Sequence, residues 1–206
     1  MKYSTAALSL ATFSLAVLVP LSSASAQNGQ READRMVRAR ASLNHTLDAD
    51  HTAPGYQFRA TLSDNVHLSD GVELHRGDAL LGRVTTDDMN TPGRSRLAIR
   101  FNQAVLKNGQ TVPIKATIVS LYPPGDFLNN SYSTEQIPNT WNDGTLRVDQ
   151  IGAVKDVDLH SRISSQNSGV FVSTKKEDVK IPAGSEIALA ITARNNTSLN
   201  SGNSGS

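Results

Sequence analysis

The chain has 206 residues, with 20 basic and 19 acidic side chains and no cysteine. The absence of cysteine excludes disulfide bonds, thiolate metal sites and a cysteine nucleophile, so a buried apolar core must supply the stability. The nearly balanced charge argues against nucleic-acid binding, which normally needs a basic excess to neutralise phosphates.

Residues 1–26 have the pattern of a secretory signal. An apolar stretch of 16 residues, 6–21, follows Lys2 and precedes a small-residue cleavage site that ends at Ala26. The stretch contains Pro20 and is short for a membrane-spanning helix, which needs about 20 residues. An uncleaved membrane anchor is the alternative. We expect removal of the signal, which leaves a periplasmic or extracellular protein with no membrane span.

Two polar segments flank the body of the chain. Residues 27–40 carry four arginines, with Glu32 and Asp34 among them. We interpret this segment as a charged leader, helical in part or flexible, and binding to an anionic surface is the alternative. Residues 195–206 contain one apolar residue in twelve, too few to offset the entropy of ordering, so this tail is predicted to be disordered.

Residues 41–194 are predicted to form a single β domain. Apolar residues alternate with other residues at Leu97, Ile99 and Phe101, and again through 112–118 and 187–191. This period of two is typical of strands with one buried face. Turn signals rich in Gly, Pro and Asn separate the apolar segments. The pattern predicts an all-β fold, an antiparallel barrel or sandwich of short strands.

A nine-residue pattern occurs twice, at 66–74 and at 179–187, with Gly71 and Gly184 at equivalent positions. Aliphatic residues spaced by two precede each glycine, which favours a strand followed by a tight turn. We expect both glycines to have positive φ, because glycine adopts that conformation without steric cost. The aliphatic residues three positions before the glycines should be buried, and these are Leu68 and Ile181.

Three further glycines are interpreted as turns between strands. Asn108-Gly109 lies in an imperfect copy of the repeat, and this dipeptide favours a type I′ hairpin turn. Gly77 and Gly82 have the spacing of a phosphate-binding loop, yet Arg83 and Val84 occupy the positions where that loop needs Lys and Ser or Thr. Strand turns therefore explain these two glycines better than phosphate binding does.

A long segment, 122–146, interrupts the strand pattern and is rich in Pro, Asn, Ser and Gly. Such a long loop is uncommon in a compact domain and is often functional. Two interpretations remain open, a platform for a partner or ligand and a cover for one end of the barrel. The side chains that would form either one are Tyr122, Phe127, Tyr132 and Trp141.

No set of residues predicts catalysis, cofactor binding or a metal site. His67 and His75 flank the Gly71 turn and could meet across a hairpin, but a zinc site needs three or four converging ligands. The other histidines lie in polar surroundings. No nucleophile elbow is present. Asp87 and Asp88 are adjacent, so on an extended backbone they point apart and are poorly placed for a paired-carboxylate mechanism.

Four segments of the β domain carry a family resemblance, and they are Leu74-His-Arg-Gly77-Asp-Ala-Leu-Leu-Gly82, Gly93-Arg-Ser95-Arg96-Leu-Ala-Ile99, Asn108-Gly109-Gln-Thr-Val-Pro-Ile114 and Val179–Leu189. They resemble the β domain of TrbI-like proteins, which are outer-membrane core components of conjugation and type IV secretion machines. The chain nevertheless shows no apolar helical hairpin and no long Pro-rich spacer. The resemblance implies a similar β scaffold without implying secretion, and small exported bacterial β proteins that carry only this domain are similar too.

These observations favour an exported, non-catalytic β domain that serves as a structural or protein-interaction module of the cell envelope. A partner could pair with an exposed strand edge or contact the 122–146 loop. The alternative function is a β-barrel that binds a small ligand or carbohydrate beneath the aromatic loop. A hydrolase is the third and weakest hypothesis.

Overall fold

A computed structural model describes residues 35–125, 146–175 and 178–194. These residues form strands and loops, and no helix occurs among them, so the predicted all-β class is confirmed. The strands are β1 (Val37–Leu43), β2 (Leu47–Asp48), β3 (Gln57–Leu62), β4 (Val66–His67), β5 (Glu73–Leu74), β6 (Ala79–Thr85), β7 (Ser95–Val105), β8 (Thr111–Tyr122), β9 (Arg147–Val154), β10 (Val157–Arg162), β11 (Gly169–Ser173), β12 (Lys180–Ile181) and β13 (Glu186–Ala193).

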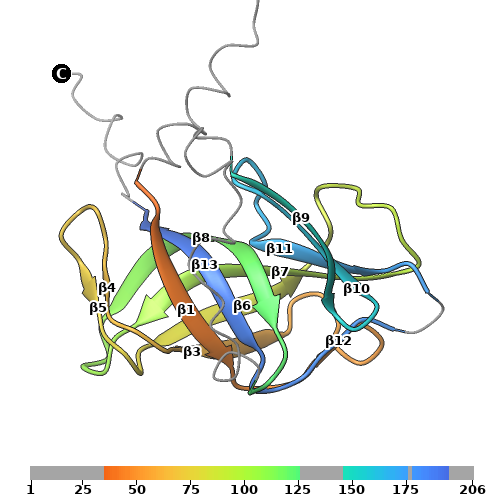
Figure 1. The fold of residues 1–206 in the computed structure, drawn as a ribbon. Helices are drawn as coiled ribbons and strands as arrows, with labels where there is room; N and C mark the ends of the chain where they lie inside the picture. Colours follow the sequence, from red (N-terminus) through yellow and green to blue (C-terminus); the bar gives the residue numbers. More distant parts are fainter. Residues whose placement is uncertain (1–34, 126–145, 176–177, 195–206) are drawn as a thin grey trace, which may run out of the picture.

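Six antiparallel strands close into a barrel. Their order is β6-β3-β1-β13-β8-β7, and pairing between β6 and β7 completes the ring. Figure 1 shows β1, β3, β6, β8 and β13 wrapped around one interior. Closure removes the exposed edges that an open sheet of these strands would have. The barrel alternative of the sequence prediction is therefore correct.

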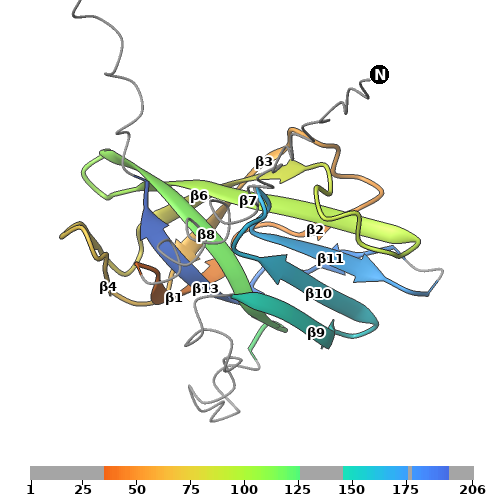
Figure 2. The same ribbon diagram turned by 90° about the horizontal axis from the view of Figure 1, so that it is seen from above.

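A three-stranded extension leaves the barrel at β7. The first residues of β7, Ser95–Ile99, pair with β11, and the sheet continues through β10 to β9. Figure 2 shows β9 at the outer margin of this extension. The extension also packs against β8, where Ser120 Oγ donates a hydrogen bond of 3.2 Å to Gln150 Oε1. Two short pairs, β2 with β12 and β4 with β5, complete the fold.

The core lies inside the barrel and beneath the extension. Alternate residues of each barrel strand point inward, and β3 buries Phe58, Ala60 and Leu62 in this way. Leu68 and Ile181 are 3% and 1% exposed, which confirms the predicted burial of both side chains. Burying one face of each strand in a shared apolar interior is the main stabilising contribution available to a chain without disulfides.

The glycine predictions are mostly confirmed. Gly71 and Gly184 have φ of +87° and +79°, as expected, and Gly77 and Gly109 have φ of +91° and +84°. The interpretation of Gly82 as a turn is wrong, because Gly82 lies within β6 and faces the core. There a Cβ atom would lie only 2.3 Å from the Phe58 ring, so the glycine makes room for an aromatic side chain.

The Asn108-Gly109 turn also differs from the prediction. A type I′ turn requires positive φ at both central residues, and among the described non-glycine residues only Asn90 and Asp156 have positive φ. Instead, Leu106 N–H bonds to Gln110 O and Gly109 N–H bonds to Leu106 O, which defines a three-residue loop. The Asn108 side chain accepts a hydrogen bond from Gln110 N–H and favours this alternative.

The two copies of the nine-residue pattern adopt different structures. The first is the β4–β5 hairpin around Gly71. The second resembles the turn at Gly77, because Gly184 N–H donates to Leu43 O as Gly77 N–H donates to Leu62 O. In both turns the glycine comes shortly before a barrel strand. The structural equivalent of Gly184 is therefore Gly77, and the sequence pattern wrongly indicated Gly71.

The barrel begins four residues before the predicted boundary at residue 41. β1 starts at Val37, so the end of the 27–40 segment belongs to the sheet. Arg40 lies in β1 and forms an ion pair with Asp64, with Nη2 at 2.6 Å from Oδ1. Alanines alternate with the arginines in this strand. Because alanine is only weakly apolar, the two-residue period of the strand was not recognised in the sequence. Residues 1–34, including the predicted signal, and the predicted tail lie outside the described residues.

Candidate functional site

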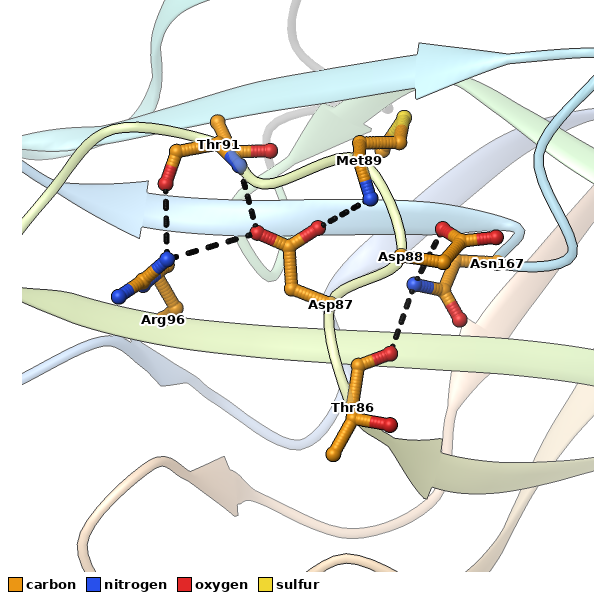
Figure 3. Close-up of polar contacts among 7 residues, drawn as sticks. All are labelled: Thr86, Asp87, Asp88, Met89, Thr91, Arg96 and Asn167. Carbon is orange, nitrogen blue, oxygen red and sulfur yellow. Dashed lines mark hydrogen bonds and ion pairs between the residues drawn. The ribbon is translucent and has the colours of Figure 1, made fainter.

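The adjacent carboxylates Asp87 and Asp88 each stabilise a loop (Figure 3). Asp87 accepts hydrogen bonds of 2.8 and 2.7 Å from the backbone N–H groups of Met89 and Thr91. Its carboxylate also lies 3.8 Å from Arg96 Nη1, which donates to Thr91 O at 3.1 Å. These bonds fix the loop between β6 and β7. The two carboxylates serve different contacts, as their adjacency led us to expect.

Asp88 joins the β6–β7 loop to the loop between β10 and β11. It accepts hydrogen bonds from Ser165 Oγ and from Gln166 N–H, both 2.7 Å. Asn167, which is 2% exposed, donates from Nδ2 to Asp88 at 2.8 Å and to Thr86 O at 3.0 Å, as Figure 3 shows in part. These hydrogen bonds hold the two loops together.

Four histidines lie near carboxylates. On the β4–β5 hairpin, His67 approaches Glu73 from the facing strand at 3.2 Å, and His75, two residues after Glu73, lies 3.7 Å from it. His160 Nδ1 lies 2.8 Å from Asp149 Oδ1 on the extension. Among residues 35–125, 146–175 and 178–194, no group of three or more potential ligands is arranged to hold a metal ion.

The predicted aromatic platform is only partly visible. Tyr122 ends β8 and is half-buried. Phe127, Tyr132 and Trp141 lie outside the described residues, and so does most of the 122–146 loop. The binding of a small ligand or carbohydrate by this loop stays a prediction.

A cleft of about 390 Å³ lies on the outer face of the barrel, over β3, β6 and β7. Most of its lining consists of outward-facing residues of these strands, because the strand period alternates them with the core residues. Among the residues that the structure describes, this lining contains two arginines and a histidine, and no carboxylate. The residues are His45, Tyr56, Gln57, Phe58, Arg59, Leu81, Gly82, Arg83, Asn102 and Gln103.

Strand register brings the cleft arginines together. Gln57 on β3 lies opposite Arg83 on β6, and Arg59 lies opposite the neighbouring outward residue of β6, Leu81. Arg59 and Arg83 are therefore diagonal neighbours, a relationship within reach of long side chains. On its other side Arg83 lies directly opposite Arg100 of β7, whose Nε donates a 2.7 Å hydrogen bond to Gln166 O. Three arginines that are distant in the sequence thus occupy neighbouring strand positions, and two of them line the cleft.

A second exposed feature is the free edge of the extension. In the described sheet β9 pairs with β10 alone. The pairing shifts register between Gln150 and Val154, so residues 151–153 form a bulge in which Ile151 and Gly152 are exposed and Ala153 is buried. Ile151 is 90% exposed there, and the bulge is held by a 2.9 Å bond from Gly152 N–H to Asp158 Oδ1. An isoleucine exposed to this degree on a strand edge is a candidate contact for a partner.

Comparisons with known proteins do not place the chain in a family. No family model matches it, and no curated protein matches it. The chain is similar to the structure of ComB10 of the Com type IV secretion system of Helicobacter pylori, with a TM-score of 0.38 and 11% sequence identity over 76% of this chain and 85% of ComB10. The resemblance of the four segments to the TrbI-like β domain stays a prediction, because a similarity this weak carries no further argument. A similarity at this level does not extend to function.

Sequence reasoning missed both surface features. The available signal was the outward position of Arg59 and Arg83 within apolar strands, but their proximity depends on the pairing of β3 with β6. Ile151 lies shortly after the predicted 122–146 loop. Its exposure results from a bulge in β9 that no residue pattern predicted. No helix among the described residues has the length and apolar character to cross a membrane.

Proposed function

We propose that the protein is an exported, non-catalytic β-barrel that acts as an interaction module of the cell envelope. The observation that supports this proposal most directly is the outer edge of β9, which pairs with β10 alone in the described sheet and carries the exposed Ile151. The signal-like N-terminus supports export. The satisfied carboxylates Asp87 and Asp88 support a structural use for the most prominent acidic pair.

The shape of the edge favours a different protein as partner over a second copy of the chain. A bulge twists an edge strand away from flat pairing, which is a common protection against association between identical edges. The regular part of β9 that pairs with β10 spans only residues 147–150. We therefore expect a partner that adds a short extended segment beside β9 and receives Ile151 in an apolar pocket.

Site-specific crosslinking tests this contact. A photoreactive phenylalanine analogue replaces Ile151 in the full chain, expressed in the source cells, and the control carries it at Asn108, which is exposed at the β7–β8 loop. We expect one discrete adduct from position 151 and none from position 108. Ile151→Asp in the unlabelled chain should also fail to compete for the adduct. No adduct from position 151, or the same adducts from both positions, would contradict the proposal.

Export has its own test. Fractionation of the source cells followed by intact-mass analysis measures both the compartment and the N-terminus of the mature chain. We expect a chain that begins after Ala26, in the periplasm or outside the cell. A full-length chain recovered from the cytoplasm would contradict export while leaving the β9 contact to be judged by crosslinking.

A further inference from the structure

The outer-face cleft has positive charge that the described part of the chain does not neutralise. Its lining includes Arg59 and Arg83, and among the described residues it contains no carboxylate. Within the part of the chain that the structure describes, neither of these arginines forms an ion pair or a side-chain hydrogen bond. Arg83 also lies directly opposite Arg100, and like charges in that position destabilise a sheet. A bound anion would supply the missing counter-charge.

The cleft floor does not suit an extended peptide. β3 pairs with β1 and β6, and β6 pairs with β3 and β7, so the central strands of the cleft have a neighbour on each side. Their backbone groups serve the barrel, and a ligand on this face must be recognised through side chains. Strand addition, the usual way of binding an extended peptide to a sheet, needs a free edge.

The remaining lining suits a carbohydrate. Tyr56 is 47% exposed, and its ring offers an apolar face with a polar tip. Gln57, Asn102 and Gln103 are exposed and carry amide groups that can both donate to and accept from hydroxyl groups. The volume of about 390 Å³ is at the lower end of the range for small-molecule sites and accommodates one or two sugar rings.

We propose that this cleft binds an acidic carbohydrate, a short saccharide whose sugar ring carries a carboxylate. Arg59 and Arg83 bind the carboxylate, because the planar guanidinium matches carboxylate geometry. Tyr56 contacts the ring, and Gln57 and Gln103 bind its hydroxyl groups. This site is separate from the β9 edge, so neither proposal depends on the other.

Titration calorimetry at low ionic strength tests the proposal with three probes, a galacturonate trisaccharide, a neutral galactose trisaccharide and inorganic phosphate. We expect the acidic saccharide to bind and the other two to bind at least about tenfold more weakly. Arg59→Gln and Arg83→Gln should each weaken binding about tenfold, and Arg83→Lys should restore only part of the loss.

Arg76→Gln is the matched control, because Arg76 is an exposed arginine outside the cleft lining and its loss changes the net charge equally. It should change the affinity by less than about twofold. Circular dichroism confirms that each variant is folded. Equal binding of the neutral saccharide, binding of phosphate alone, or unchanged affinity in both cleft variants would overturn the proposal.

Discussion

The Phe58 ring covers Gly82 on the neighbouring strand, and a Cβ atom at residue 82 would lie 2.3 Å from Phe58 Cζ. Register places Phe58, Gly82 and Phe101 in one row across β3, β6 and β7. The two phenylalanine rings meet edge to face over the glycine, with centroids 5.4 Å apart. The glycine is therefore required for the aromatic packing inside the barrel wall.

Gly82→Ala should lower the free energy of unfolding by about 1–3 kcal/mol, because the added methyl group displaces the buried Phe58 ring. Urea unfolding followed by circular dichroism measures the change. Phe58→Leu provides the control, since the smaller side chain leaves space for the methyl group. The double variant should lose less than the sum of the two single variants. Additive losses would show that the two side chains do not compete for this space.

Gly71→Val and Gly184→Val should each cost roughly 1–3 kcal/mol, because a β-branched residue is strained at positive φ. At Gly71 nothing lies within 4 Å of the position that a Cβ atom would take, so the cost there is conformational. Gly71→Asn is the control, and it should cost less, because asparagine tolerates this conformation. Thermal unfolding provides the measurement. Equal melting temperatures for the valine variants and the wild-type chain would contradict the expected strain at positive φ.

The sequence predicted the β class and the buried face of the strands because a two-residue period follows directly from burying one side of a strand. It could not predict strand order, since the pairing of β13 with β1 and β8 joins residues far apart in the chain. The predicted type I′ turn at Asn108 was wrong because the hydrogen bond from Gln110 N–H to the Asn108 side chain outweighed the preference of the Asn-Gly dipeptide. The sequence could not predict the cleft for the same reason, because only the pairing of β3 with β6 brings Arg59 and Arg83 close together.

Asn167→Ala should lower the free energy of unfolding by about 1–3 kcal/mol, because it removes the hydrogen bonds that the buried Asn167 side chain makes with Thr85, Thr86 and Asp88. Hydrogen exchange should increase in both loops that the side chain joins. Asn102→Ala is the comparison, since Asn102 is an exposed amide and its loss should change stability by less than about 0.5 kcal/mol. Similar effects of the two variants would contradict a joining role for Asn167.

The Asp149 carboxylate should stabilise the folded protein at neutral pH and lose this effect at acidic pH. Partial burial raises its pKa, but the hydrogen bond from His160 and the positive charges of Arg147 and His160 outweigh this effect and lower the pKa below the usual value. A lowered pKa in the folded state stabilises the protein above the ordinary carboxyl pKa of about 4, and this contribution is lost as pH falls through the lower value. Unfolding by urea between pH 7 and pH 3 measures it.

Asp149→Asn removes the titrating group and keeps the shape of the side chain. The difference in stability between wild type and this variant should be largest at neutral pH and shrink below about pH 4. Asp70→Asn is the control, because Asp70 is exposed at the β4–β5 hairpin and forms no ion pair within the described residues. A constant difference for Asp149→Asn across the pH range would contradict the lowered pKa.

Arg83→Gln should stabilise the free protein slightly, by about 0.2–1 kcal/mol, because it removes the like charge opposite Arg100. The gain should be greatest at low ionic strength and vanish near 1 M salt, where charges are screened within about 3 Å. Arg76→Gln should show no such gain, since Arg76 lies in a turn and has no arginine opposite it in the described strand pairs. Urea unfolding at several salt concentrations measures both variants. A loss of stability for Arg83→Gln at low salt would show that its guanidinium is favourably placed without a ligand, and the argument from uncompensated charge would then be wrong.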